Sequence, residues 1–206
     1  MSATRPYHSP RRSEAAAATR LDILDAARRL FLDRGYAQVT VADIAREAGI
    51  AVKTVYASAG GKAEILQEIV GTAVSTSGAQ ETVDRVRRCA DGASALAALA
   101  RGTRRGNERN RASVTILFGA LPVHESAGAL WEEGTAVYRQ ALHDVAEHLS
   151  LTGALREGIE VERCADLLWL CFGLGAWRTL VEECGWTWDA AEEQLTAMAA
   201  GLLLRP

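Results

Sequence analysis

Apolar residues recur at three- and four-residue intervals along most of the chain, which is the spacing of one face of an α-helix. The first such segment predicts a helix over residues 13–34, ended by Gly35. Its apolar positions are Leu24, Ala27, Leu30 and Phe31. The chain has no extended run of alternating Val, Ile and Thr, and it has only four prolines. The pattern therefore predicts an all-α protein.

Short helices are predicted directly after the first one. A second helix begins at Thr40, whose hydroxyl can accept from the amide three residues on, and Asp43 lies in its favourable first turn. Gly49 ends this helix. We expect a third helix over residues 52–58 and a fourth that starts near Lys62, after a pair of glycines.

The rest of the chain predicts a helical body. A break near Ser75–Gly78 is followed by a more acidic composition and by short connections, as helical bundles prefer. The expected helices, which bring the total to about nine or ten, cover residues 80–89, 93–105, 108–121, 126–150, 161–184 and 187–203. We therefore expect a disordered basic tail over residues 1–12, an N-terminal domain over 13–75 and a C-terminal domain over 76–206.

The charge is divided unevenly between these parts. The net charge is −3, but residues 1–62 hold ten Lys or Arg against six acidic residues, a net of +4, and the remainder has a net of −7. A basic head on an acidic body is typical of a head that binds phosphate. A chance distribution explains the same numbers.

The sequence lacks the motifs that are typical of several classes of enzyme and of membrane proteins. There is no nucleophile elbow, phosphate loop or paired-carboxylate motif, so we predict no catalytic residue and no cofactor. A helical-bundle enzyme would need a catalytic constellation that the sequence does not contain. The longest apolar run, Leu167–Trp177, is shorter than a membrane span, and no signal peptide precedes the head, so we expect a cytoplasmic protein.

Metal and disulfide sites are not predicted either. His124, His143 and His148 have no ligand spacing, and no Asp or Glu cluster accompanies them in the sequence. The four cysteines are scattered and form no paired motif. We interpret these residues as surface or core side chains.

Residues 40–62 combine the features of a helix-turn-helix. The first helix has an apolar face that can brace its neighbour, and Gly49 supplies the hinge. The second helix has apolar anchors at Ile50 and Val55. Its donors are Lys53, Thr54 and Tyr56, which can bond phosphate oxygens, and Lys62 adds a charge at the next helix start. Two packed helices of an ordinary bundle would show a similar pattern.

A gap-free run of short motifs covers residues 20–66. The motifs are Leu30-Phe31, Gly35-Tyr36, Thr40-Val41, Asp43-Ile44-Ala45, Ala48-Gly49-Ile50, Thr54-Val55-Tyr56 and Lys62. This run resembles the DNA-binding domain of the TetR family of transcriptional regulators. The resemblance implies an all-α homodimer in which three N-terminal helices bind DNA and a fourth connects them to the body. The body would dimerise and enclose a small-molecule effector, whose binding releases the operator.

The sequence departs from the family pattern at two places. Ala51 stands where the family often has an N-cap Ser, which loses about 0.5–2 kcal/mol of capping. Ala57-Ser58-Ala59 stands where the family usually has an aromatic or His pair ending in Phe, which removes a phosphate contact and a packing ring. The predicted DNA-binding positions are Thr40, Ala51, Val52, Lys53, Thr54, Tyr56, Ser58 and Lys62.

The body contains candidates for an effector pocket and for a dimer interface. Aromatic residues gather in its sequence, which suits an apolar effector but equally an ordinary core. The pocket candidates are Phe118, His124, Trp131, Tyr138 and Trp177. The interface candidates, on two apolar helices with small residues, are Leu167, Leu170, Gly173, Leu174, Trp177, Leu195, Met198 and Leu202. A buried monomer core is the alternative for this second set.

These features predict a ligand-responsive transcriptional regulator, a repressor that binds a pseudo-palindromic double-stranded operator as a homodimer. Its partners would be operator DNA, a second copy of itself and a small-molecule effector. The alternative is a helical small-molecule-binding protein whose DNA binding is weakened or lost, which the stretch Ala57-Ser58-Ala59 favours.

Overall fold

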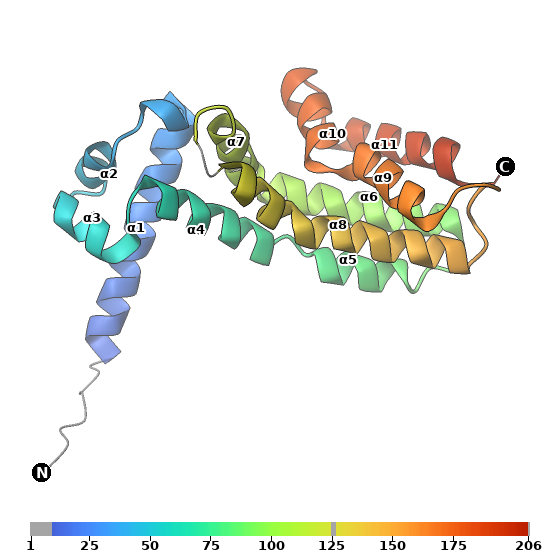
Figure 1. The fold of residues 1–206 in the computed structure, drawn as a ribbon, viewed down its shortest axis with the longest axis horizontal. Coiled ribbons are helices and arrows are strands. Elements are labelled where there is room, and N and C mark those ends of the chain that lie inside the picture. The colour runs from blue at the N-terminus through green and yellow to red at the C-terminus, as the bar shows by residue number, and fades with distance from the viewer. Residues whose placement is uncertain (1–9, 125–126, 206) are drawn as a thin grey trace, which may run out of the picture. The chain divides into compact units, whose positions relative to one another are not determined.

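The computed structural model of the protein describes residues 10–124 and 127–205. Within these residues the chain is helical apart from turns and one isolated β-bridge between Leu155 and Leu204 (Figure 1). The predicted all-α class is therefore confirmed. The described residues form two compact units, and each has its own core.

The first unit consists of the chain up to Val70 together with the segment Thr115–Gly128. Its elements are α1 (Pro10–Arg34), a 3-10 turn η1 (Tyr36–Gln38), α2 (Val41–Glu47), α3 (Val52–Ala59) and the first part of α4 (Lys62–Ser75). Helix α1 starts three residues before the predicted residue 13, at Pro10, because the fixed φ of proline suits a first helical turn. The rest of the predicted tail, residues 1–9, lies outside the described residues.

The core of the first unit is built from one apolar stripe on each helix. The buried side chains include Ile23, Leu24, Leu30, Phe31, Ile44, Val55, Ile65, Leu66 and Ile69. Burial of each large aliphatic side chain contributes about 1.5–3 kcal/mol. Val41 and Ile50, which were predicted to be buried, are only half-buried, because Val41 opens α2 and Ile50 lies in the turn before α3.

The second unit contains Gly71–Val114 and the chain from Ala129 onward. Its helices are α5 (Ala79–Val86), α6 (Gly92–Arg109), the first residues of α7 (Arg111–Ala120), most of α8 (Ala127–Leu151), α9 (Val161–Phe172), α10 (Leu174–Arg178) and α11 (Trp188–Leu203). Helix α6 packs against α5 and α11, and α11 packs against α9. A Cβ atom on Gly102 would lie 2.3 Å from Thr82, so glycine is required for the close approach of α5 and α6.

The single helix predicted over residues 161–184 is interrupted at Gly173. The chain forms α9, then α10, then a π-helical turn η2 (Thr179–Glu183). The Ala176 amide donates to the carbonyl of Gly173 and not to that of Phe172, which leaves the Phe172 oxygen outside the helical ladder. That oxygen accepts from the Trp177 indole at 3.2 Å and from the Tyr138 hydroxyl. The break therefore exchanges one backbone hydrogen bond for two from side chains.

The apolar stretch at this break is longer than the sequence pattern suggested. Residues 161–183 form the one helical segment of the described chain that meets the length and composition of a membrane span, although only 33% of its most apolar window is buried within the protein. Core helices meet the same criteria. Helix α9 contributes Cys164, Leu168, Cys171 and Phe172 to the core of the second unit, so its apolar side chains have partners inside the protein.

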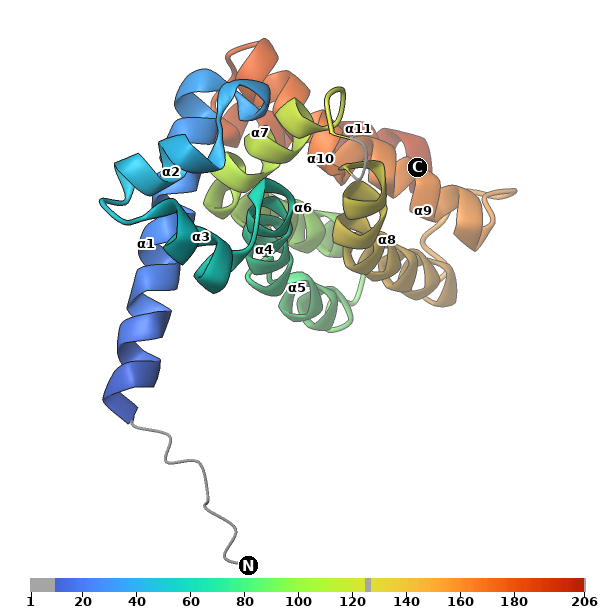
Figure 2. The ribbon, with the colours of Figure 1, turned by 60° about the vertical axis from the view of Figure 1, so that its left-hand side comes forward.

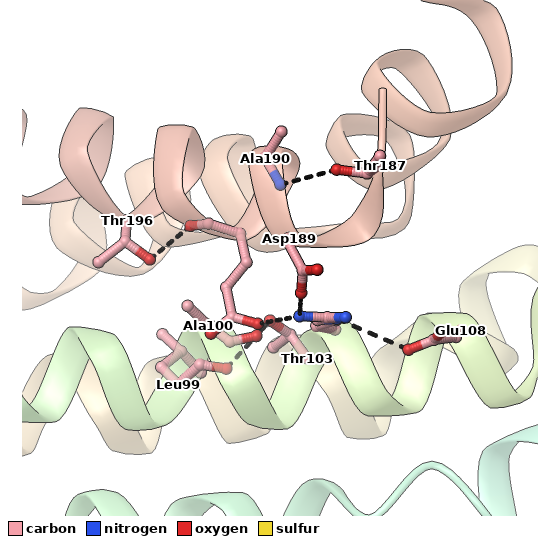
Figure 3. A network of polar contacts seen from close by, with 10 residues as sticks. Leu99, Ala100, Thr103, Glu108, Thr187, Asp189, Ala190 and Thr196 are labelled. Atoms are coloured by element: carbon pink, nitrogen blue, oxygen red, sulfur yellow. Dashed lines mark hydrogen bonds and ion pairs between the residues drawn. The ribbon is translucent and has the colours of Figure 1, made fainter. Parts of the chain in front are cut away.

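A polar cluster joins α6 to α11 at the edge of this core (Figure 3). The Arg104 Nη1 atom lies 2.5 Å from Asp189 and 3.0 Å from Glu192, both on α11, and its Nε atom lies 3.6 Å from Glu108. The hydrogen bonds that Arg104 donates to Glu192 and Asp189 raise the pKa of Arg104 above its ordinary value. The cluster fixes the rotation of α11, whose other face carries several of the predicted interface residues.

Candidate nucleic-acid interface

The start of α2 is a complete capping box. The Asp43 amide donates to the Thr40 hydroxyl at 3.1 Å, while the Thr40 amide and hydroxyl donate to Asp43 Oδ2 at 3.0 and 2.6 Å. Hydrogen bonds from Thr40, with a further one from Arg46, lower the pKa of Asp43 to about 2. Because both donors of Thr40 are engaged by Asp43, the structure gives Thr40 a capping contact where the sequence predicted a DNA contact.

The turn between α2 and α3 depends on Gly49, which has a φ of +68°. Only glycine adopts this left-handed conformation without strain. The Ile50 amide donates back to the Ala45 carbonyl at 2.9 Å, which closes the turn. Ala51 then precedes α3 in an extended conformation and offers no side-chain cap, as the sequence predicted.

Helix α3 has one buried face and one exposed face. Val55 and Ala59 are buried, with exposures of 0% and 3%. On the other side Val52 is 41% and Tyr56 57% exposed, and Ala51 and Lys53 are also exposed. The remaining predicted contacts on this helix, Thr54 and Ser58, are half-buried. The exposed face thus presents an ammonium and a phenol side by side, both of which can donate to phosphate.

Most cations of the first unit are already paired with carboxylates. The pairs are Arg20–Glu68, Arg28–Asp25, Arg29–Glu47, Arg34 with Asp33 and Asp43, and Arg46–Asp43. Among the described side chains of this unit, Lys53 is the cation that makes neither an ion pair nor a hydrogen bond. Lys53 therefore offers an unneutralised charge on the exposed face of α3.

Lys62 has a more enclosed position than the sequence suggested. Its ammonium lies 4.1 Å from the centre of the Tyr36 ring and donates to the Ala37 carbonyl at 3.4 Å. Burial lowers the pKa of Lys62. At the start of α4 the Gly61 amide donates to Glu64 Oε2 at 2.9 Å. Lys62 therefore supports the junction of η1 with α4 in addition to any contact with DNA.

Tyr36 lies at the centre of this junction. From the sequence it was identified only as part of the Gly35-Tyr36 motif. Its ring centre is 5.0 Å from that of Phe31 and 5.4 Å from that of His124. The side chain is 4% exposed, and its hydroxyl has no hydrogen-bond partner among the described residues. Burial and the charge of Glu64 raise the pKa of Tyr36 to about 12.

The five predicted effector residues are divided between the two units. Phe118 and His124 belong to the first unit, whereas Trp131, Tyr138 and Trp177 belong to the second. In the second unit the ring of Trp169 joins two of them, at 6.5 Å from Trp131 and 5.6 Å from Tyr138. The Tyr138 hydroxyl also accepts from Asn107 at 3.4 Å, and burial raises the pKa of Tyr138. Trp169 belongs to the aromatic set of the body that the sequence contains, whereas Asn107 was not predicted, because its partner Tyr138 is distant in sequence.

The predicted dimer residues divide into a buried and an exposed group. Gly173, Trp177 and Leu195 are buried within one chain, and Leu167 and Leu174 are half-buried. Leu170, Met198 and Leu202 are 61%, 37% and 40% exposed on α9 and α11. The alternative of a monomer core therefore describes the first group, and the second group remains available to a partner.

One histidine does have acidic neighbours, contrary to the expectation that no acidic cluster accompanies the histidines. Ligand atoms of His143, Asp144 and Glu147 lie within 4.8 Å of one another on α8. This group contains a single histidine, so the spacing between histidines does not reveal it. Asp144 already accepts from Arg87 at 3.1 Å and from Gln140 at 2.9 Å, so it is engaged within the protein.

Comparisons with known proteins agree with the geometry of the head. Residues 23–69 match the family described as bacterial regulatory proteins, tetR family. This match covers the second half of α1, all of α2 and α3, and about half of α4. A comparison with curated protein sequences found no match.

Solved structures with a similar fold cover nearly the whole chain. The structure described as a SmeT–triclosan complex is 21% identical, with a TM-score of 0.70, and the match covers 91% of this chain and 92% of that one. A transcriptional regulator from Saccharomonospora viridis in complex with choline is 20% identical, with a TM-score of 0.71, covering 92% and 100%. The fatty acid degradation regulator FadR from Bacillus halodurans is 17% identical, with a TM-score of 0.69, covering 97% and 100%. At these identities the likeness establishes the fold.

Proposed function

We propose that the chain is a DNA-binding transcriptional regulator of the TetR family, because residues 23–69 match that family and form a helix-turn-helix. In this proposal it represses transcription by binding a pseudo-palindromic operator as a homodimer. A small-molecule effector then releases it. In this proposal residues 13–75 form the DNA-binding domain, and residues 76–206 bind the effector and the second subunit. The protein acts on cytoplasmic DNA and catalyses no reaction.

The exposed face of α3 is the observation that supports this proposal most strongly. Lys53 is unpaired among the described residues, and Tyr56 is more than half exposed beside it. An α-helix fits the major groove of B-DNA, where such side chains reach phosphates and base edges. Ala51, Val52, Thr54 and Ser58 complete the proposed contact surface on the same helix.

A dimer follows from the proposed operator symmetry. Two copies of α3 must lie about 34–36 Å apart, or a multiple of this distance, to enter major grooves on one side of the duplex. We assign the interface to the exposed apolar side chains of α9 and α11, namely Leu170, Met198 and Leu202. Apolar side chains with this exposure on two packed helices suit an isologous four-helix contact.

An effector site in the body is supported by the fold. Two structures with this fold are described as complexes with small molecules, triclosan in one and choline in the other. We propose that the effector of this protein contacts Trp131, Tyr138 and Trp177 in the second unit, where aromatic rings accompany a small number of polar groups. Coupling between the two sites is reciprocal, so DNA weakens effector binding as much as the effector weakens DNA binding.

A helical small-molecule-binding protein with weakened DNA binding is the second candidate. The stretch Ala57-Ser58-Ala59 favours it, because Ala57 and Ser58 place no aromatic ring at the end of α3. The two candidates differ in their predicted response to salt, since phosphate contacts release counterions and produce a steep negative slope of affinity against salt.

Fluorescence anisotropy with the duplex upstream of the protein's own gene tests the proposal. We expect binding that weakens steeply between about 50 and 200 mM salt. Sedimentation at micromolar concentration should show a dimer. The proposal fails if the protein neither binds this duplex nor enriches any other sequence from a random library, even at low salt. Only the second candidate function would then remain.

A further inference from the structure

Helix α3 is short, and its own sequence does little to fix its orientation. It spans eight residues, buries only Val55 and Ala59, and has no basic residue in its last turn. No side chain caps its amino end. At its carboxyl end, small residues replace the aromatic pair that the family resemblance leads us to expect. The orientation of this helix must therefore be fixed by contacts from other helices.

Arg20 of α1 makes such a contact at the carboxyl end of α3. Its Nη1 atom donates to the backbone carbonyl of Ser58. Carbonyl groups at this end of a helix carry the negative end of the helix dipole, so a guanidinium is a strong partner for them. Figure 2 shows α3 beside α1, which allows one side chain to bridge the two helices.

The other edge of the same guanidinium is held by α4. The Nε atom of Arg20 lies 2.8 Å from Glu68 Oε1, and its Nη2 atom lies 2.7 Å from Glu68 Oε2. The first contact is a hydrogen bond and the second is an ion pair. A lysine has a single ammonium group and cannot hold this carboxylate and the Ser58 carbonyl in the same planar geometry. One side chain thus joins α1, α3 and α4, with partners 38 and 48 residues away in sequence.

We propose that Arg20 is a positioning residue that sets the orientation of α3, and with it Lys53 and Tyr56, against the duplex. The inference rests on the proposed role of α3 in DNA recognition. Because Glu68 neutralises the guanidinium, Arg20 supplies geometry and not phosphate neutralisation. A direct phosphate contact by Arg20 is the competing explanation, and the two differ in salt dependence.

The test compares Arg20→Lys, Arg20→Ala and the control Arg28→Lys, which alters a half-buried arginine on the same helix whose ion pair lies within α1. The probes are a duplex enriched by the wild-type protein from a random library and a random-sequence duplex of equal length. We expect both Arg20 variants to bind the enriched duplex about tenfold more weakly than the wild type. A loss of this size is typical when one base pair is no longer contacted correctly. Affinity for the random duplex and the salt slope should stay unchanged.

Hydrogen exchange provides a second measurement that does not depend on DNA. Amides of α3 should exchange faster in Arg20→Lys than in the wild type, while those of α2 keep their protection. If Arg20→Ala does not fold, Arg20→Lys decides alone. The control Arg28→Lys should match the wild type in every measurement.

Two results would overturn the proposal. In the first, Arg20→Lys binds like the wild type while Arg20→Ala lowers the salt slope by about 1.8, which assigns the Arg20 of each subunit to a phosphate. In the second, both variants keep wild-type affinity and α3 protection. If the wild-type protein enriches no duplex, that result contradicts the proposed function and not the role of Arg20. The hydrogen-exchange measurement still tests whether Arg20 fixes the orientation of α3.

Discussion

Replacing Tyr36 with phenylalanine should stabilise the protein. The side chain is 4% exposed and its hydroxyl has no partner among the described residues. A buried polar group without a hydrogen bond costs about 1–3 kcal/mol. Tyr36→Phe removes this cost, creates no cavity, and keeps the ring contacts with Phe31, His124 and Lys62. We expect a gain of about 1 kcal/mol in the free energy of unfolding, at the lower end of that range.

The advantage of the variant should grow at alkaline pH. The pKa of Tyr36 is raised to about 12, whereas a tyrosine in the unfolded chain titrates near 10. Above pH 10 the unfolded state releases the phenol proton and the folded state retains it, so ionisation favours unfolding. The wild type therefore loses up to about 1.4 kcal/mol per pH unit between pH 10 and 12 from this residue, and Tyr36→Phe does not.

Urea denaturation of both proteins at pH 7.5 and pH 10.5 measures the two effects. The midpoint of Tyr36→Phe should be higher at both values, and the difference should be larger at pH 10.5. The m-value should not change, since the surface exposed on unfolding is the same. A variant that is less stable than the wild type at pH 7.5 would show that the hydroxyl has a partner, and the reasoning would be refuted.

The remaining predictions concern the DNA contact, the cap of α2 and the dimer. Lys53→Ala and Tyr56→Ala should each weaken operator binding at least several-fold at unchanged thermal midpoint, and only Lys53→Ala should lower the salt slope, by about 1.8 because the dimer loses two contacts. Unaltered gel-shift titrations of both variants would contradict the assignment of α3. Thr40→Ala should cost about 1 kcal/mol of stability at pH 7. Because the pKa of Asp43 is about 2, this cost should fade as the pH falls from 4 to 2 in an acid titration followed by circular dichroism, and a cost independent of pH would exclude the Asp43 contact. Leu202→Glu should convert the dimer to a monomer in sedimentation, and an unchanged dimer would move the interface elsewhere.

The elements that the sequence predicted well are those whose signals are local. Thr40 and Asp43 are three residues apart, and Gly49 acts on its own backbone, so the start of α2 and the turn before α3 follow from a few neighbouring residues. The exposed and buried faces of α3 follow from helical periodicity in the same way. The fold class and the candidate surface of α3 could therefore be derived without coordinates.

The features that the sequence did not predict depend on distant partners. The break at Gly173 is one: the Phe172 carbonyl that it frees accepts from the hydroxyl of Tyr138, which lies 34 residues earlier in the chain. Lys62 is another, because the aromatic ring beneath it comes from a residue 26 positions earlier. The segment Thr115–Gly128 was expected in the C-terminal domain, and its place in the first unit is likewise decided by packing.

The pairing of arginines with carboxylates in the first unit has a consequence for how the protein searches a genome. Random DNA attracts a protein mainly through unpaired cations, and most described cations of this head are already matched. Decoy sequences should therefore hold the protein only briefly. We expect the protein to search DNA for its operator by frequent dissociation and rebinding. Few protein molecules should then be held at non-specific sites, even when the cell contains few copies of the protein.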